Sequence, residues 1–134
     1  MRPCWFSGEL ILKKRLGKRG KWNLLGSVYL VSAHTPEEAF DKFCEIGKTW
    51  CLSEQASCPS MECEFSGVGQ MAPLYEKLED GIEILETLSL QGSLKDVNDA
   101  VSTLIHSKDL LVANIWSAER NRIHHGIPPM FSEQ

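Results

Sequence analysis

The sequence predicts an α+β fold, with a mostly antiparallel sheet of about four strands, one packed helix and a C-terminal helical extension. Three observations lead to this prediction. Four segments have the composition or the alternation of strands. A strong helix-start signal separates the first two of these segments from the last two. After residue 92, apolar residues recur at helical spacing instead. The expected order of the sheet domain is therefore β-β-α-β-β.

The first two strands are expected at residues 4–13 and 24–33. In the first, Phe6, Gly8, Leu10 and Leu12 fall on one face, because successive strand residues point to opposite sides. The second is rich in residues that favour strands. The ten residues between them, KRLGKRGKWN, are basic and carry two glycines. They predict a long hairpin loop.

A helix is expected from about residue 35 to about residue 50. Thr35 is the expected N-cap, Pro36 takes the first helical position, and Glu38 completes a capping box. One face of this helix is apolar and carries Ala39, Phe40, Phe43, Cys44 and Gly47. Residues 52–60 are expected to form a loop.

Two further strands are expected at residues 61–68 and 82–88. The first alternates well, with Glu62 and Glu64 on the face opposite its apolar residues. The turn pair Asp80-Gly81 precedes the second.

The C-terminal part changes to a helical period. An apolar stripe runs from residue 94 to residue 105, after a weaker capping box formed by Ser93 and Asp96. A further helix is expected at about 109–123, before Gly126 and two prolines. We therefore expect residues 1–90 to form the sheet domain, and residues 91–134 a helical extension packed on it as part of one structural unit.

Bulk properties limit the class of protein. The chain has 134 residues, 43% of them hydrophobic, which suffices for one core. No apolar run approaches the roughly 20 residues that span a bilayer. Glu9 interrupts the apolar start, which argues against a signal peptide. We expect a bacterial cytoplasmic protein that does not enter membranes. The five cysteines are then expected to be reduced thiols.

The charges are unevenly spread. Residues 1–34 hold seven Lys and Arg and one acid, a net +6, whereas residues 37–86 hold three Lys and twelve acids, a net −9. Such a distribution is compatible with steering of a charged partner. It also fits a basic hairpin that lies beside an acidic helix and sheet edge.

Cysteine and histidine spacing indicates neither a metal site nor a cofactor. No two cysteines are separated by two residues, the spacing typical of structural zinc. Cys44 and Cys63 fall on apolar faces, where cysteine acts as a small hydrophobic residue. Cys58, in the expected loop, is the one candidate nucleophile, and no partner histidine can be assigned to it.

The basic hairpin is the candidate site for an anion or a nucleic acid. Cations next to an aromatic ring can bind phosphate and stack a base. The residues concerned are Lys13, Lys14, Arg15, Lys18, Arg19, Lys21 and Trp22. The simpler interpretation is a solvated loop, and the acidic middle of the chain disfavours a large nucleic-acid surface.

Residues 5–88 carry a pattern that resembles a known family. It comprises WFSGELIL, then YLVSAHTPEEAF, Ile46-Gly47-Lys48, EFSGVGQMAPLYE and LEDGIEILETL. This pattern resembles the bacterial domain-of-unknown-function family 4288. The resemblance implies the β-β-α-β-β fold but no activity and no functional residue. Small bacterial families of this kind include immunity proteins of toxin systems, an association by analogy.

The string from Arg120 to Gly126 resembles the Arg-Asn-x4-His box of the HEPN ribonucleases. That resemblance would give Arg120, Asn121 and His125 roles in cleaving an RNA phosphodiester, with Arg stabilising charge and His moving protons. The family, however, needs a larger helical bundle, and two prolines here follow the histidine. The alternative interpretation is a basic helix C-terminus that suits the helix dipole.

The tail GIPPMFSEQ is apolar and is expected to pack on the domain, on a second copy or on a partner. The leading hypothesis is a non-enzymatic protein-interaction module, of immunity type, that contacts a protein partner or itself through the C-terminal extension. The competing hypothesis is an RNA-binding or RNA-cleaving protein.

Overall fold

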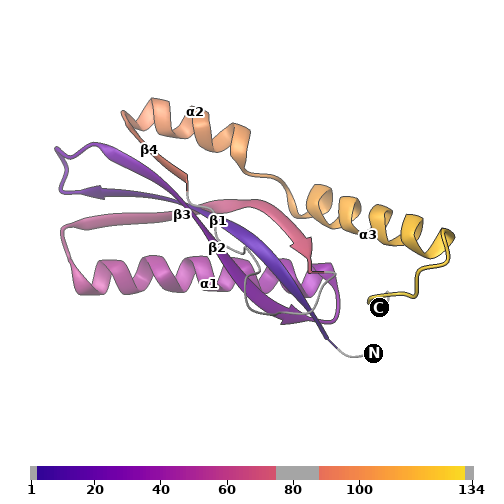
Figure 1. The fold of residues 1–134 in the computed structure, drawn as a ribbon. Coiled ribbons are helices and arrows are strands. Elements are labelled where there is room, and N and C mark those ends of the chain that lie inside the picture. The colour runs from indigo at the N-terminus through magenta and orange to yellow at the C-terminus, as the bar shows by residue number, and fades with distance from the viewer. Residues whose placement is uncertain (1–2, 75–87, 132–134) are drawn as a thin grey trace.

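A computed structural model of the chain describes residues 3–74 and 88–131 (Figure 1). Its elements follow the order β1 (Cys4–Leu16), β2 (Trp22–Ala33), α1 (Pro36–Ser57), β3 (Met61–Pro73), β4 (Leu88–Gly92), α2 (Leu94–Leu104) and α3 (Lys108–His124). The α+β class and the antiparallel sheet with helices are therefore confirmed. The expected strand at 82–88 lies, except for its last residue, outside the described residues.

The sheet is antiparallel wherever its strands pair. β1 lies between β2 and β3, and the short β4 pairs with the first residues of β2, giving the order β3-β1-β2-β4. Bulges interrupt the pairing of β1 with β3 between Gly8 and Leu12. Such irregularities bend and twist a strand pair, and the long strands cross obliquely in Figure 1.

The sheet separates two apolar cores. Phe6, Leu10 and Leu12 belong to the larger core, under α1, as the alternation of the first strand predicts. Ile11 points to the other side and joins a smaller core with Trp22, Leu24 and Val97 of α2. α1 and α2 thus cover opposite faces of the sheet (Figure 1).

α1 begins as predicted but ends later. Thr35 Oγ1 accepts from the backbone N–H of Glu38 at 3.2 Å, as an N-cap does. The expected helix end near residue 50 and the expected loop at 52–60 are wrong, because α1 continues to Ser57. Cys51 is buried on the same face as Phe43 and Gly47, so tertiary packing stabilises two more turns.

The hairpin loop is shorter than the ten residues expected from the sequence. β1 extends to Leu16 and β2 begins at Trp22, which leaves a turn of only five residues, 17–21. Gly17 has a φ of +72°, a conformation that glycine adopts without steric cost. Lys14 and Arg15 therefore lie, like Lys13, in a paired strand, and not in the loop that the sequence predicted for them.

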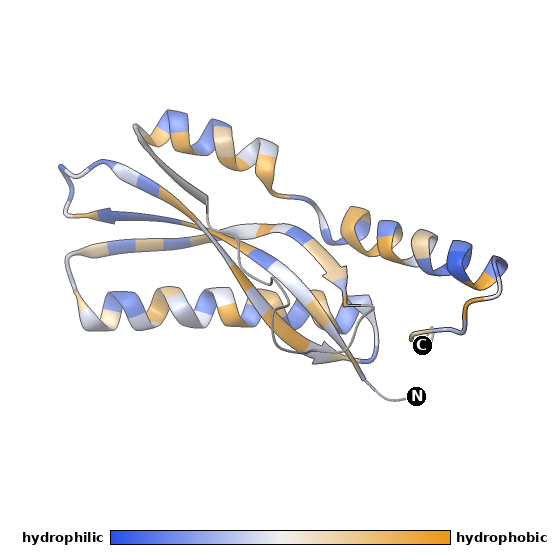
Figure 2. Ribbon diagram, viewed as in Figure 1, coloured by the Kyte–Doolittle hydropathy of each residue, from blue (hydrophilic) through white to orange (hydrophobic). Residues whose placement is uncertain are grey.

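α3 packs beside α1 and the edge strand β3. Its Lys108 Nζ lies 2.8 Å from Asp41 Oδ1, and Trp116 Nε1 donates to Glu37 Oε1 at 2.8 Å. Leu111 and Ile115 join the larger core. Figure 2 shows hydrophobic and hydrophilic residues interspersed along each helix, as expected when one face lies on a core.

Candidate functional site

Three of the cations proposed as anion contacts are paired with carboxylates within the fold. Lys13 Nζ lies 3.3 Å from Glu64, and Arg15 Nη2 lies 2.7 Å from Glu62. Both pairs are directly opposite in the register of β1 and β3. On the other face, Lys14 Nζ lies 3.3 Å from Glu54 of α1. Such cross-strand pairs stabilise a sheet, so these cations already have partners.

Trp22 does not offer a free face for a nucleobase. Its side chain is 8% exposed and belongs to the core under α2. The guanidinium carbon of Arg15 lies 4.6 Å from its ring centroid, and Lys13 Nζ lies 5.5 Å from it, which are cation–π distances. The indole Nε1 and Arg15 Nε are buried without a hydrogen-bond partner. The ring of Trp22 is therefore already in contact with Lys13 and Arg15.

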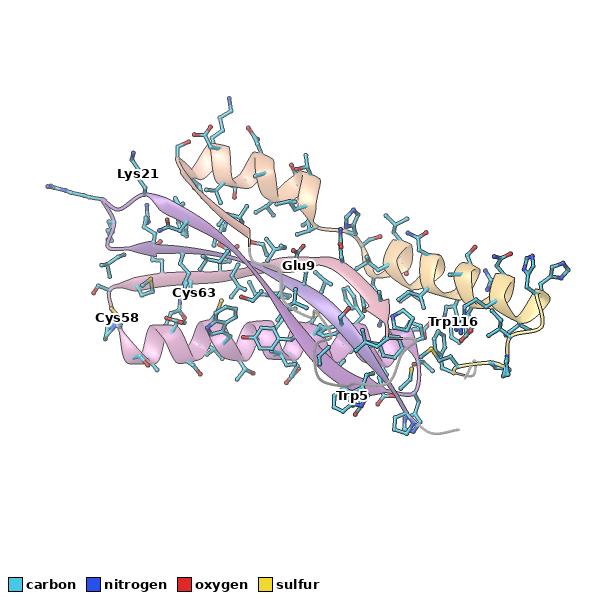
Figure 3. The ribbon with its side chains drawn as sticks, viewed as in Figure 1. Trp5, Glu9, Lys21, Cys58, Cys63 and Trp116 are labelled. Carbon is cyan, nitrogen blue, oxygen red and sulfur yellow. The ribbon has the colours of Figure 1, made fainter. Side chains whose placement is uncertain are left out.

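The remaining three cations of the predicted site lie at the turn. Lys18, Arg19 and Lys21 are exposed, and Figure 3 shows Lys21 at the end of the molecule far from Trp116. The candidate anion site thus shrinks from six cations to three exposed side chains on a tight turn.

The string that resembles the HEPN box forms the end of α3. Arg120, Asn121 and His125 are exposed. His125 is the C-cap, and its Nδ1 lies 2.8 Å from the backbone oxygen of Asn121, one turn earlier. Gly126 follows with a φ of +83°, which ends the helix. The histidine ring thus makes a local contact that a helix terminus alone explains.

A buried carboxylate in the same helix was not predicted. Glu119 is 1% exposed, and its Oε2 accepts from the backbone N–H groups of Met130 and Phe131 at 3.1 and 3.4 Å. Its Oε1 lies 3.3 Å from Arg122 Nη1. In the sequence, nothing distinguishes Glu119 from other polar helix residues. Its backbone hydrogen-bond donors come from the tail, which folds back against α3.

Met130 and Phe131 of the tail pack back on the domain, one of the three alternatives that the sequence left open. The Phe131 ring lies 4.9 Å from that of Trp116 and 5.7 Å from that of Phe6. Cys4 belongs to the same region, and burial together with the Glu119 carboxylate raises the pKa of its thiol to about 11. α3 and the tail therefore form a hydrogen-bonded and apolar anchor on the body.

The cysteines occupy separate surroundings. Cys44 is partly buried against the larger core, and burial raises the pKa of its thiol. Cys58 caps α1, with its sulfur 3.8 Å from Ser60 Oγ. Cys51 and Cys63 are buried and in mutual contact, which the spacing did not reveal. Within residues 3–74 and 88–131, no three His, Cys, Asp or Glu side chains gather as metal ligands would.

No helix among the described residues is long and apolar enough to cross a membrane. Comparison of the chain with protein-family models, with curated proteins and with solved structures gives no match. The resemblance of residues 5–88 to family 4288 and that of residues 120–126 to the HEPN box therefore stay predictions.

Proposed function

We propose that the protein is a non-enzymatic protein-interaction module, of immunity type, whose C-terminal extension binds a protein partner or a second copy. The observation that carries this proposal is that α3 is held rigidly on the body of the protein. The Lys108–Asp41 ion pair and the hydrogen bond from Trp116 to Glu37 fix its inner side to α1. The buried Leu111 and Ile115 pack on the larger core, and Glu119 holds the backbone of the tail against α3. A binding surface that is fixed before binding loses less conformational freedom on association.

Apolar side chains remain exposed on this fixed element and directly after it. Leu110, Ile123 and Ile127 are 41–47% exposed, although the rest of the extension has an apolar core to join. Leu94 of α2 is exposed to a similar degree.

The test places a charge at exposed apolar positions of α3. Leu110→Glu and Ile123→Glu should weaken self-association, measured by sedimentation equilibrium, or binding to the product of a neighbouring gene, measured by calorimetry. Leu52→Glu is the matched control, because Leu52 is also exposed but lies on α1. Equal behaviour of the three variants would exclude the extension as the binding surface.

RNA chemistry is the second candidate, supported by the three exposed cations of the turn and by the string at the end of α3. Under the first proposal, Arg120→Ala and His125→Ala leave the fold intact and change stability by less than about 0.5 kcal/mol, as surface substitutions usually do. Incubation with single-stranded and transfer RNA at low salt separates the two proposals. Cleavage by the wild type that His125→Ala abolishes would establish the ribonuclease instead.

A further inference from the structure

Two buried cysteines from different elements bring their sulfur atoms into contact. Cys51 of α1 and Cys63 of β3 are 6% and 8% exposed, and their Sγ atoms are 2.6 Å apart. Heavy atoms that are not bonded usually approach to about 3.5–4.0 Å, whereas a disulfide spans about 2.05 Å. The two sulfurs therefore need only a small approach to bond, in a structure in which both are free thiols.

The backbone on each side fixes this approach. Cys51 lies on the face of α1 that also buries Phe43 and Gly47. Cys63 lies opposite Lys14 in the ladder between β1 and β3. Gln55 Nε2 of α1 donates to the backbone oxygen of Cys63 at 3.2 Å. Helix and strand are thus joined immediately around the pair, so the sulfurs meet without a rearrangement of the chain.

We propose that Cys51 and Cys63 form a redox pair that a small peroxide converts to a disulfide. This proposal does not rest on the proposed function. Figure 3 shows Cys63 toward the end of the molecule that carries Lys21, away from Trp116 of α3. Because both thiols are nearly inaccessible, the oxidant that fits is a peroxide as small as hydrogen peroxide, rather than a bulky disulfide.

The reaction balances in two steps. The Cys63 thiolate attacks one peroxide oxygen and becomes a sulfenic acid, and the other oxygen leaves as hydroxide. Cys51 sulfur then attacks the sulfenic sulfur, which forms the S–S bond and expels the sulfenic oxygen as water. In sum, two thiols and one hydrogen peroxide give one disulfide and two waters, and two electrons pass from sulfur to oxygen.

The surroundings indicate which thiol reacts first. Burial raises the pKa of both thiols, that of Cys51 to about 12. The contact between the two sulfurs and the nearby Lys14 ammonium oppose this rise for Cys63, while Glu54 reinforces it. For Cys51 the contact acts the other way and favours the neutral thiol. Cys63 is therefore the attacking thiolate, and its scarcity at neutral pH makes the first step slow.

Oxidation would join the last turns of α1 to β3 covalently. The bond closes a loop between residues that are 12 apart in sequence, and such cross-links restrict the unfolded chain. We expect the oxidised protein to unfold at a higher denaturant concentration than the reduced protein. We also expect slower hydrogen exchange of the amides in residues 51–57, because local opening of these turns is hindered.

The test treats the reduced full-length protein with hydrogen peroxide and then alkylates it under denaturing conditions. Reactive thiols should fall from five to three, the mass should fall by two hydrogen atoms, and one linked peptide should contain Cys51 and Cys63. Dithiothreitol should reverse all three changes and the stability shift. Five remaining thiols, a sulfinic acid without a link, or a link to Cys58 would each overturn the proposal.

Serine variants provide the matched comparison. Cys51→Ser and Cys63→Ser should lose the linked peptide and the stability shift, whereas Cys44→Ser should keep both. If a variant does not fold, the peptide map of the wild type still decides the outcome, because it requires no substitution.

Discussion

Phe43 and Gly8 make the close contact that seats α1 on the sheet. Phe43 is fully buried, and a Cβ built on Gly8 would lie 2.6 Å from its Cε2 and Cζ atoms. The aromatic ring therefore occupies the space that any side chain at position 8 would need. Phe40, which the sequence places on the same apolar face, is only partly buried, and its ring centroid lies 5.8 Å from the ammonium of Lys108 of α3.

This contact predicts how two substitutions combine. Phe43→Ala should cost about 3–5 kcal/mol of unfolding free energy, from lost burial and a cavity. Gly8→Ala should cost about 1–3 kcal/mol, because the new methyl group overpacks the ring. In the double variant the methyl group enters the cavity. The combined loss should then be smaller than the sum by about 0.5–3 kcal/mol, the usual coupling of residues in contact.

Denaturant unfolding of the four proteins, with midpoints and slopes compared, measures this coupling. The control combines Gly8→Ala with Phe65→Ala. Phe65 lies opposite Leu12, four residues beyond Gly8 and thus about 13 Å away at about 3.3 Å per strand residue. The control pair should be additive to within about 0.5 kcal/mol. If Gly8→Ala and Phe43→Ala are equally additive, the assigned contact between α1 and β1 is wrong.

Two further predictions concern buried ionisable groups. Glu119→Ala should destabilise the protein by about 1–3 kcal/mol for each backbone N–H left without an acceptor, with faster exchange of the Met130 and Phe131 amides. Glu119→Gln keeps an acceptor oxygen and should therefore lose less stability. If the hydrogen exchange of these two amides is unchanged in both variants, Glu119 does not anchor the tail. Because burial raises the pKa of Cys51 from 9.0 to about 12, the unfolded state loses this proton first as pH rises. Unfolding free energy should therefore fall above about pH 9, and more steeply in the wild type than in Cys51→Ala; parallel slopes would refute this assignment.

The features that the sequence predicts well are those that neighbouring residues determine. Both capped helix starts are examples, since Thr35 and Ser93 accept from backbone N–H groups three residues later. The face of the first strand is another, because alternation alone assigns Phe6, Leu10 and Leu12 to the core under α1. Such signals depend on residues within one or two turns of the chain.

The features that it misses depend on contacts between distant segments. The continuation of α1 past residue 50 goes with the packing of Cys51 against β3, a contact that the local sequence does not reveal. The partners of Glu119 are backbone groups of the tail, which no residue pattern reveals. Contact between Cys51 and Cys63 likewise requires the register of a helix against a strand. These are tertiary effects that override or extend local preference.

Cations of the basic segment 1–34 form ion pairs with carboxylates of the acidic segment 37–86. These pairs bear on the choice between the two proposed functions. Lys13, Lys14 and Arg15 pair with Glu64, Glu54 and Glu62. Only Lys18, Arg19 and Lys21 of the candidate site then remain exposed at the turn. If each cation met one phosphate, affinity for single-stranded RNA would fall only about 20-fold between 50 and 200 mM salt, against the 10³–10⁵-fold loss typical of six to ten contacts with duplex DNA. These three cations alone would therefore contribute only a small electrostatic term to RNA binding at physiological salt. The ion pairs instead serve the fold, since they join the acidic strand β3 and helix α1 to the basic end of β1. This use of the charges leaves little of the basic hairpin for an RNA backbone, which weighs against the RNA-binding proposal.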